Sequence, residues 1–181
     1  MASRKNATGW SEVKAKLADF DRSGLIGLIQ DLYSANKDNQ AFLHARFALG
    51  ADVLMPYKAT IARWLWPDVF TNQQTSVSRA KKAISDYKKA MGQSEGLAEL
   101  MVFYCEQAAG FSHEVGLQDD AYFDALVRMF EQAMIAIAAL PDGQRATFYV
   151  RLDAVRRTSH KFGYGVGDSM DDLLVELGVD D

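Results

Sequence analysis

The chain has 181 residues, of which 49% are hydrophobic and 24% are charged, and its formal net charge is −4. These values are typical of one globular domain or at most two small ones, and the single cysteine, Cys105, excludes an intramolecular disulfide. The sequence has no apolar run of the roughly 18 to 20 residues that cross a membrane, and it starts with a polar segment, so we expect a soluble, cytoplasmic protein.

Charge is divided unevenly along the chain. Residues 1–92 contain 14 Lys and Arg against 8 Asp and Glu, whereas residues 93–181 contain 6 against 16. We expect a single helical domain over 11–178, with a basic half at 11–92, an acidic half at 93–178, and flexible ends at 1–10 and 179–181. Such a split indicates two halves that dock on each other or a surface polarised for a partner.

Helical periodicity recurs along the chain and long alternating segments rich in Val, Ile and Thr are missing, so we expect an all-α protein of about eight or nine helices. The first helix is predicted over 11–18. The second runs to about residue 35, with Asp21 as N-cap and Phe20 before it packing on Leu25. Asp38 is expected to cap a third helix that stops at Gly50.

A fourth helix is predicted over 52–66, with Pro56 in its first turn and Pro67 ending it. The fifth, over 76–91, has the clearest amphipathic pattern and ends at Gly92.

Two helices, over 94–112 and 120–139, are apolar on more than one side and are expected to form the central pair. Further helices are predicted over 142–160 and 168–178. Short connections favour antiparallel helical hairpins, arranged as a compact bundle or a short curved α-α stack. The side chains expected to be buried are Leu28, Ile29, Leu32, Ile84, Tyr104, Phe123, Leu126, Phe130 and Leu152.

Four segments combine these apolar faces with particular polar positions: FLHARF (42–47), SVSRAKKAISDYKKAMG (76–92), ELMVFYCEQAAGFSHEVG (99–116) and YFDALVRMFEQAM (122–134). Over roughly residues 11–140 this pattern resembles that of a bacterial family of uncharacterised all-helical proteins. The resemblance implies no activity, cofactor or catalytic residue.

The densest basic run lies in the predicted helix over 76–91. Its members are Arg79, Lys81, Lys82, Lys88 and Lys89. Such a stripe can contact phosphates, with Trp64 or Trp66 nearby to stack on bases. We favour the alternative, a solvated helix face, because the isoelectric point is near 5.4 and base-reading side chains are sparse on this helix.

A glycine-rich loop is the most enzyme-like feature of the sequence. It contains Gly163, Gly165 and Gly167 and follows the basic residues Arg156, Arg157, His160 and Lys161. Its backbone N–H groups could cradle an anion or nucleotide at 163–169. We prefer a simple turn with Asp168 as N-cap, because the acidic residues that open the next helix, Asp168, Asp171 and Asp172, would repel a phosphate.

A polar line of Glu99, Glu106 and His113 runs at seven-residue steps along the predicted helix 94–112. It is either a buried ligand or proton-transfer site or, as we favour, the solvent-facing strip of a central helix. Two groups of aspartates, Asp168 with Asp171 and Asp172 and Asp119 with Asp120 and Asp124, resemble the magnesium sites of all-helical diphosphate enzymes, but the chain is short for the cavity that such a site needs. Cys105 is expected in the core.

These patterns contain no convincing catalytic set, so we expect a non-catalytic helical protein-interaction module that uses its oppositely charged halves, in the simplest case for self-association. The alternatives are nucleic-acid binding through residues 79–89 and anion or nucleotide binding at 163–169. No cofactor, metal or membrane partner is expected.

Overall fold

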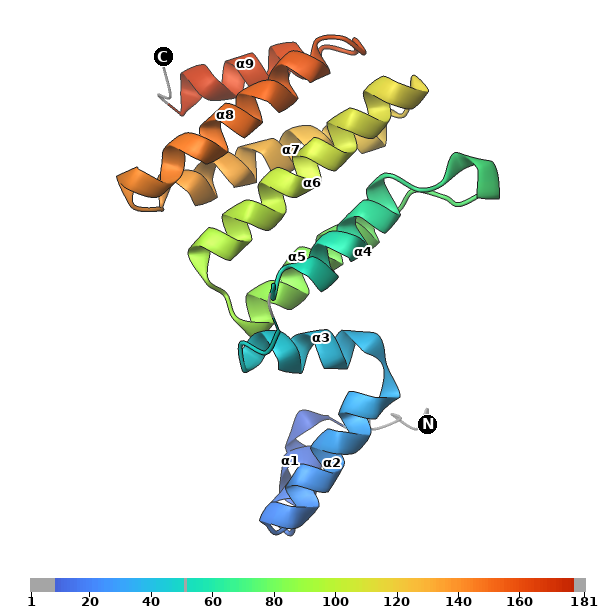
Figure 1. Cartoon of the computed structure of the whole chain (residues 1–181), viewed down its shortest axis with the longest axis vertical. Coiled ribbons are helices and arrows are strands. Elements are labelled where there is room, and N and C mark those ends of the chain that lie inside the picture. Colours follow the sequence, from blue (N-terminus) through green and yellow to red (C-terminus); the bar gives the residue numbers. More distant parts are fainter. Residues whose placement is uncertain (1–8, 51, 178–181) are drawn as a thin grey trace, which may run out of the picture. The chain divides into compact units, whose positions relative to one another are not determined.

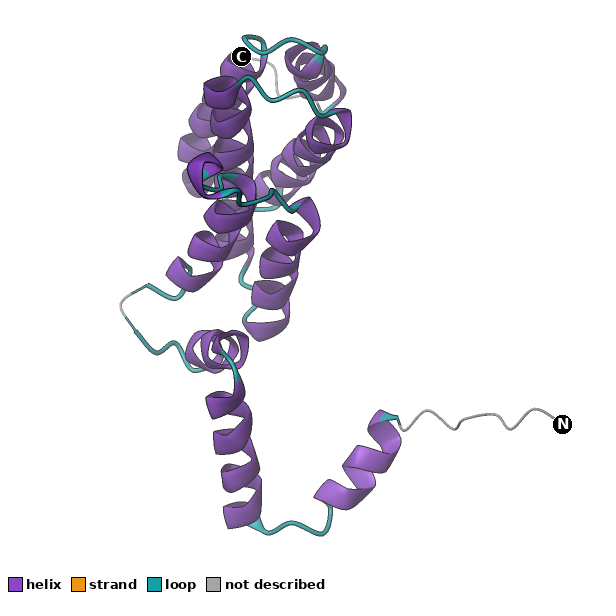
Figure 2. Cartoon of the chain, turned by 90° about the vertical axis from the view of Figure 1, so that its right-hand side faces the viewer, coloured by secondary structure: helices purple, strands orange, loops and turns teal. Residues whose placement is uncertain are grey.

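The computed structural model describes residues 9–50 and 52–177. Within these residues the regular structure is entirely helical, with nine α-helices, one short 3-10 helix and no strand, which confirms the all-α prediction (Figures 1 and 2). None of the helices in the described part of the chain is both long enough and apolar enough to cross a membrane. Internal contacts divide the chain into two units, residues 1–43 and 44–181, which we describe separately.

The first unit contains α1 (Trp10–Leu17), α2 (Arg22–Ala35) and most of α3 (Lys37–Arg46). The N-cap prediction for α2 is confirmed, because the Asp21 carboxylate accepts a 2.7 Å hydrogen bond from the Gly24 N–H. The N-cap prediction for α3 is wrong. The Asn36 side chain, just before the helix, accepts from the Asn39 N–H at 2.8 Å, whereas Asp38 already lies inside the first turn.

No described residue of the first unit is buried. The expected burial of three α2 side chains is therefore wrong, because Leu28 is half-buried and Ile29 and Leu32 are 48% and 51% exposed. The periodicity correctly shows which side of α2 is apolar. Periodicity does not show whether another element covers that side.

The second unit is built from six consecutive helices and the 3-10 helix η1 (Val69–Thr71). The six are α4 (Met55–Leu65), α5 (Val77–Ala90), α6 (Ser94–Val115), α7 (Asp120–Ala138), α8 (Asp142–Ser159) and α9 (Val166–Glu176). Each of them packs on the next in the chain, and α6 contacts α4, α5, α7 and α8 (Figure 1). The central position expected for α6 is thus confirmed.

The core of the second unit contains the remaining side chains for which burial was predicted: Ile84, Tyr104, Phe123, Leu126, Phe130 and Leu152. Buried polar groups there have partners. The hydroxyl of Tyr122 donates a 2.8 Å hydrogen bond to the carbonyl of Leu65, which joins α7 to the end of α4.

Several helix ends of the second unit also follow the sequence. Pro56 lies in the first turn of α4, Gly92 follows α5 in the left-handed conformation at φ +63°, and the Asp119 side chain caps α7. The predicted end of the last helix at Gly178 lies outside the described residues, as do positions 1–8 and 179–181 of the expected flexible ends.

Candidate functional site

The five basic residues predicted on α5 do not form one stripe. At 100° per residue, Arg79, Lys82 and Lys89 share one side of the helix, whereas Lys81 and Lys88 lie on another side, across the solvent-facing arc. All except the half-buried Lys81 are exposed. The charge of Lys82 is partly compensated, because its ammonium lies 2.5 Å from the carboxylate of Asp86.

Trp64, at the end of α4, lies beside the first of these residues. The guanidinium carbon of Arg79 is 4.2 Å from the centroid of the indole, and that of Arg63 is 4.6 Å from it. Arg63 was not among the predicted residues, because it belongs to a different helix from the basic run. The hydrogen bond from Ser76 N–H to the Trp64 carbonyl, 2.9 Å long, holds the two helices together at this point.

Trp66, the other tryptophan of this segment, packs against α6. Its ring lies so close to Gly110 of α6 that a Cβ atom added there would meet it at 2.4 Å, and it makes an edge contact with Phe111 at 6.4 Å between ring centroids. Trp66 thus helps to attach the end of α4 to α6, which leaves Trp64 as the indole associated with the basic side of α5.

The glycine loop owes its glycines to backbone geometry and packing. Gly163 and Gly165 have φ values of +80° and +66°, in the left-handed region that glycine adopts without strain. Gly167 is buried beneath His160, whose ring would meet an added Cβ at 2.4 Å. Helix α9 begins at Val166, so the prediction that Asp168 is its N-cap is wrong; Asp168 lies in the first turn.

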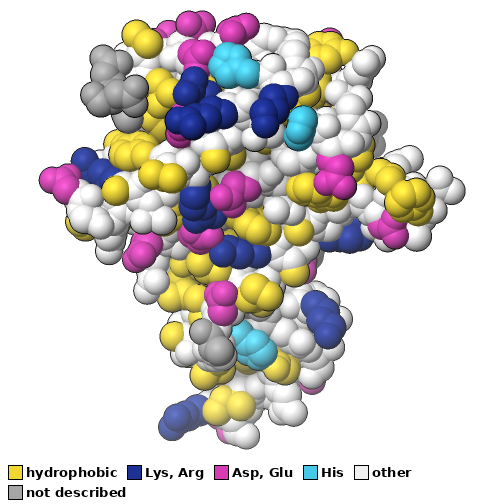
Figure 3. All heavy atoms as spheres, turned by 45° about the horizontal axis from the view of Figure 1, so that its top comes forward, with side chains coloured by type: hydrophobic (Ala, Val, Ile, Leu, Met, Phe, Trp, Pro, Cys, Tyr) yellow, Lys and Arg dark blue, Asp and Glu magenta, His cyan; other side chains and the backbone are white. Residues whose placement is uncertain are grey.

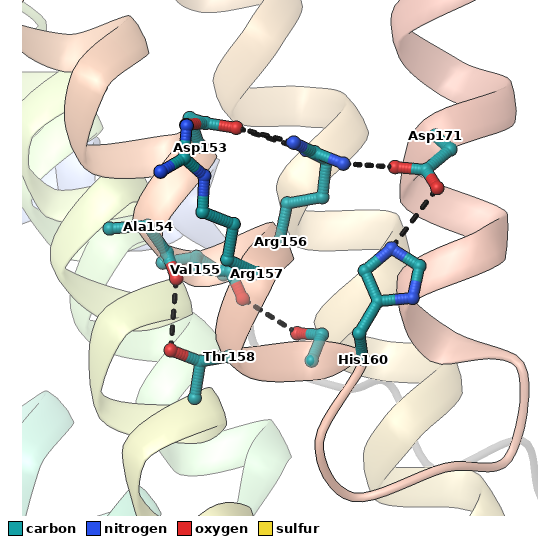
Figure 4. A network of polar contacts seen from close by, with 9 residues as sticks. Asp153, Ala154, Val155, Arg156, Arg157, Thr158, His160 and Asp171 are labelled. Atoms are coloured by element: carbon teal, nitrogen blue, oxygen red, sulfur yellow. Dashed lines mark hydrogen bonds and ion pairs between the residues drawn. The ribbon is translucent and has the colours of Figure 1, made fainter.

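The basic residues before this loop are paired with acidic side chains (Figure 4). Arg156 donates to Asp153 at 2.7 Å and to Asp171 of α9 at 2.6 Å, and Arg157 lies 2.6 Å from Asp153. The hydrogen bonds with Asp153 and Asp171 raise the pKa of Arg156, and Arg156 in turn lowers the pKa of Asp171. Arginine charges that are already compensated in this way are poorly placed to bind an added anion. The remaining basic residue before the loop, Lys161, is exposed.

His160 joins the same network. Its Nε2 lies 3.0 Å from Asp171 and its Nδ1 lies 3.6 Å from Asp168, so that one ligand atom from each residue falls within 4.8 Å of the others. The composition would suit a divalent cation. Arg156, however, holds the other oxygen of Asp171, and its positive charge opposes a metal ion there. Figure 3 shows Lys and Arg, acidic and His side chains next to one another over this end of the unit, where α8 and α9 lie.

The polar line on α6 becomes an ion-pair network between helices. Arg151 of α8 contacts Glu99 at 2.5 and 3.2 Å and Glu106 at 2.7 and 2.8 Å, and Lys58 of α4 contacts Glu99 at 2.7 Å. Burial raises the pKa of Glu99, but the hydrogen bonds from Arg151 and Lys58 outweigh it and hold that pKa below its ordinary value. Glu99 and Glu106 are thus neither a simple solvent-facing strip nor unpaired carboxylates, since both are ion-paired with Arg151. His113, the third residue of the line, is exposed.

A groove of about 270 Å³ follows α6 and α8 beside this network, lined mainly by small and apolar side chains. Cys105 does not open into it. The thiol is fully buried, and this burial, with a smaller contribution from Glu106, raises its pKa far above the ordinary value. The prediction that Cys105 belongs to the core is confirmed, and its burial disfavours the thiolate form that acts as a nucleophile.

Comparisons of the chain with known protein families, curated proteins and solved structures found no match. The resemblance to a bacterial helical family therefore stays a prediction. The described residues form an all-α protein with two notable groups of exposed side chains: large hydrophobic residues on α1 and α2, and arginines beside Trp64 where α4 meets α5.

Proposed function

We propose that the protein is a non-catalytic helical interaction module that self-associates through the apolar face of its first two helices. The observation that carries this proposal is the exposure of large hydrophobic side chains along α1, the turn after it and α2. They are Trp10, Val13, Phe20, Leu25, Ile26, Ile29 and Leu32.

This face requires a cover for its helices to be stable. Helix α1 has 8 residues and α2 has 14, and isolated helices shorter than about 12 to 15 residues are marginal in water. Full burial of one Leu, Ile or Phe side chain contributes about 1.5 to 3 kcal/mol. Large exposed hydrophobic side chains gathered on such short helices are typical of a protein interaction site.

A second copy of the chain is the occupant we propose. Residues 9–43 contain four Lys and Arg and five Asp and Glu, so two copies of this segment meet without strong repulsion. Two identical apolar faces related by a two-fold axis cover each other, and two-fold dimers are the commonest protein oligomers. The charge split assists approach: residues 44–92 have eight basic and three acidic side chains, whereas residues 93–177 have six and 14.

Native mass spectrometry and sedimentation velocity at tens of micromolar test the proposal. We expect the wild type to be a dimer and the control Val150→Glu to stay dimeric. Ile29→Glu should be a monomer whose circular dichroism loses no more helical signal than α1 and α2 contribute. Val150 is a suitable control because it is 71% exposed and lies on α8.

Three results would contradict self-association through this face. The first is a dimer in the Ile29→Glu variant. The second is a wild-type monomer; hydrogen exchange would then show whether the amides of α2 are protected by the rest of the same chain or remain open for a different protein. The third is a dimer that dissociates with moderate salt, which would assign the contact to the charged halves.

A further inference from the structure

Two guanidinium groups share one indole ring at the junction of α4 and α5. Arg63 and Arg79 are both exposed, and both lie within 4.6 Å of the centre of the Trp64 ring. Among the described residues, neither has a carboxylate partner. Each is attracted to the ring, but the two positive charges repel one another. An anion bound across them would relieve that repulsion.

An accessible aromatic ring lies on the same connection. Phe70 is 95% exposed, and it belongs to η1, where the Asp68 side chain accepts a 2.9 Å hydrogen bond from its N–H. A second bond, from the Thr71 hydroxyl to the Asp68 carbonyl at 3.1 Å, also holds this turn. Figure 1 shows that the connection projects beyond the ends of the two helices. The turn therefore presents a ring that is open to solvent and available for stacking.

Further positive charge follows along α5. Arg79, Lys82 and Lys89 lie on one side of the helix, and the ten helical steps from Arg79 to Lys89 span about 15 Å. Asp86 compensates part of the charge of Lys82, whereas Lys89 is exposed. The cations thus form a row that starts at Trp64, which matches a linear polyanion better than a single small anion.

We propose that Arg63, Trp64 and Arg79, together with Phe70 on the connection that follows α4, make up an arginine–aromatic surface that binds single-stranded nucleic acid. The guanidinium groups take successive phosphates, and the Phe70 ring stacks on an unpaired base. A duplex does not fit as well, because its bases are already stacked on each other. The acidic net charge of the whole chain is no obstacle, since the excess of basic residues over 44–92 is local.

Fluorescence anisotropy of a dye-labelled oligothymidine of about 20 nucleotides, with the full chain, measures this binding. We expect micromolar affinity in 50 mM salt that falls steeply towards 200 mM. Phe70→Ala should weaken binding by about tenfold or more, and Phe70→Tyr should retain it. Arg79→Ala should also weaken binding and reduce the slope of log affinity against log salt by about 0.7.

Controls separate this surface from general charge and from self-association. Arg128→Ala removes an exposed arginine of α7, paired with Asp124 at 3.6 Å, and should leave the affinity unchanged. Ile29→Glu should also bind normally, because α2 is not part of the surface. The two proposals can thus fail independently.

Three results would overturn the proposal. The first is no binding at about 100 μM protein in 50 mM salt. The second is binding that Phe70→Ala and Arg79→Ala leave unchanged. The third is a combined result: polyglutamate at equal charge concentration displaces the oligonucleotide, and Phe70→Ala leaves the affinity unchanged. That result would assign the surface to an acidic protein segment.

Discussion

Arg151 is the residue whose removal tests the packing of α8 on α6 most directly. Its guanidinium lies between the carboxylates of Glu99 and Glu106, and the three side chains are 27%, 18% and 32% exposed. Changing Arg151→Met keeps most of the aliphatic volume but leaves two half-buried carboxylates on one helix face. Lys58 would then be the only cation among the described residues in contact with Glu99.

The expected cost lies between two limits. Exposed ion pairs contribute about 0.2 to 1 kcal/mol, whereas removal of one partner from a fully buried pair costs about 3 to 5 kcal/mol. Because this network is partly exposed but bidentate to both carboxylates, we expect Arg151→Met to lower the free energy of unfolding by about 2 kcal/mol at pH 7. For a chain of this size, that is a fall in Tm of roughly 4 to 8 °C.

The pH dependence provides a second check. The pKa of Glu99 in the folded protein lies below its ordinary value of 4.5, because the hydrogen bonds from Arg151 and Lys58 outweigh the effect of burial. Stability from this group is therefore present above about pH 4.5 and is lost as the pH falls through the folded-state pKa. The difference between wild type and Arg151→Met should narrow correspondingly below pH 4.5.

Urea unfolding followed by circular dichroism, at pH 7 and in steps to pH 3.5, measures both quantities. A matched control is Arg157→Met, which removes an arginine whose side chain is 73% exposed and paired with Asp153; we expect a change of no more than about 0.5 kcal/mol. A loss at Arg151 as small as that of the control, or a loss that is the same at every pH, would refute the assigned role of the network.

Two further predictions concern packing. Gly110→Ala should destabilise the protein by about 1 to 3 kcal/mol, despite the better helix propensity of alanine, because the new Cβ would meet the Trp66 ring. The control Gly143→Ala should be neutral or stabilising, because the space around Gly143 is open. Equal stability of the two variants in urea unfolding would contradict this reasoning. Cys105 should react with a thiol reagent only after unfolding, because its thiol is buried and its pKa raised; labelling of the native protein at the rate of a free thiol would be the opposite result.

Local chemistry in the sequence is sufficient for most helix boundaries. Asp21 and Asp119 cap helices because each side chain reaches an N–H three residues later in the same segment, and Gly92 ends a helix because its own φ is positive. The two wrong caps, at Asp38 and Asp168, arose where several polar residues or glycines near a helix start compete for the cap. The predicted end of the third helix at Gly50 is also wrong, because α3 already ends at Arg46.

Burial depends on the neighbours of a helix as well as on its own pattern. Leu126 and Leu32 occupy equally regular apolar faces, yet the first is fully buried and the second is 51% exposed. Helix α7 has α6, α8 and α9 packed on it, whereas α2 belongs to a unit without buried side chains among its described residues. Periodicity identifies the face, and only tertiary packing supplies the cover.

The sequence by itself determined the helical class, most helix ends and the apolar faces, because these depend on interactions within a few residues. Tertiary structure alone decided which charges meet. It placed Arg151 against Glu99, 52 residues away, and placed Arg79 on an indole from the preceding helix. Such pairs depend on how helices cross, and spacing along one helix contains no information about its partners.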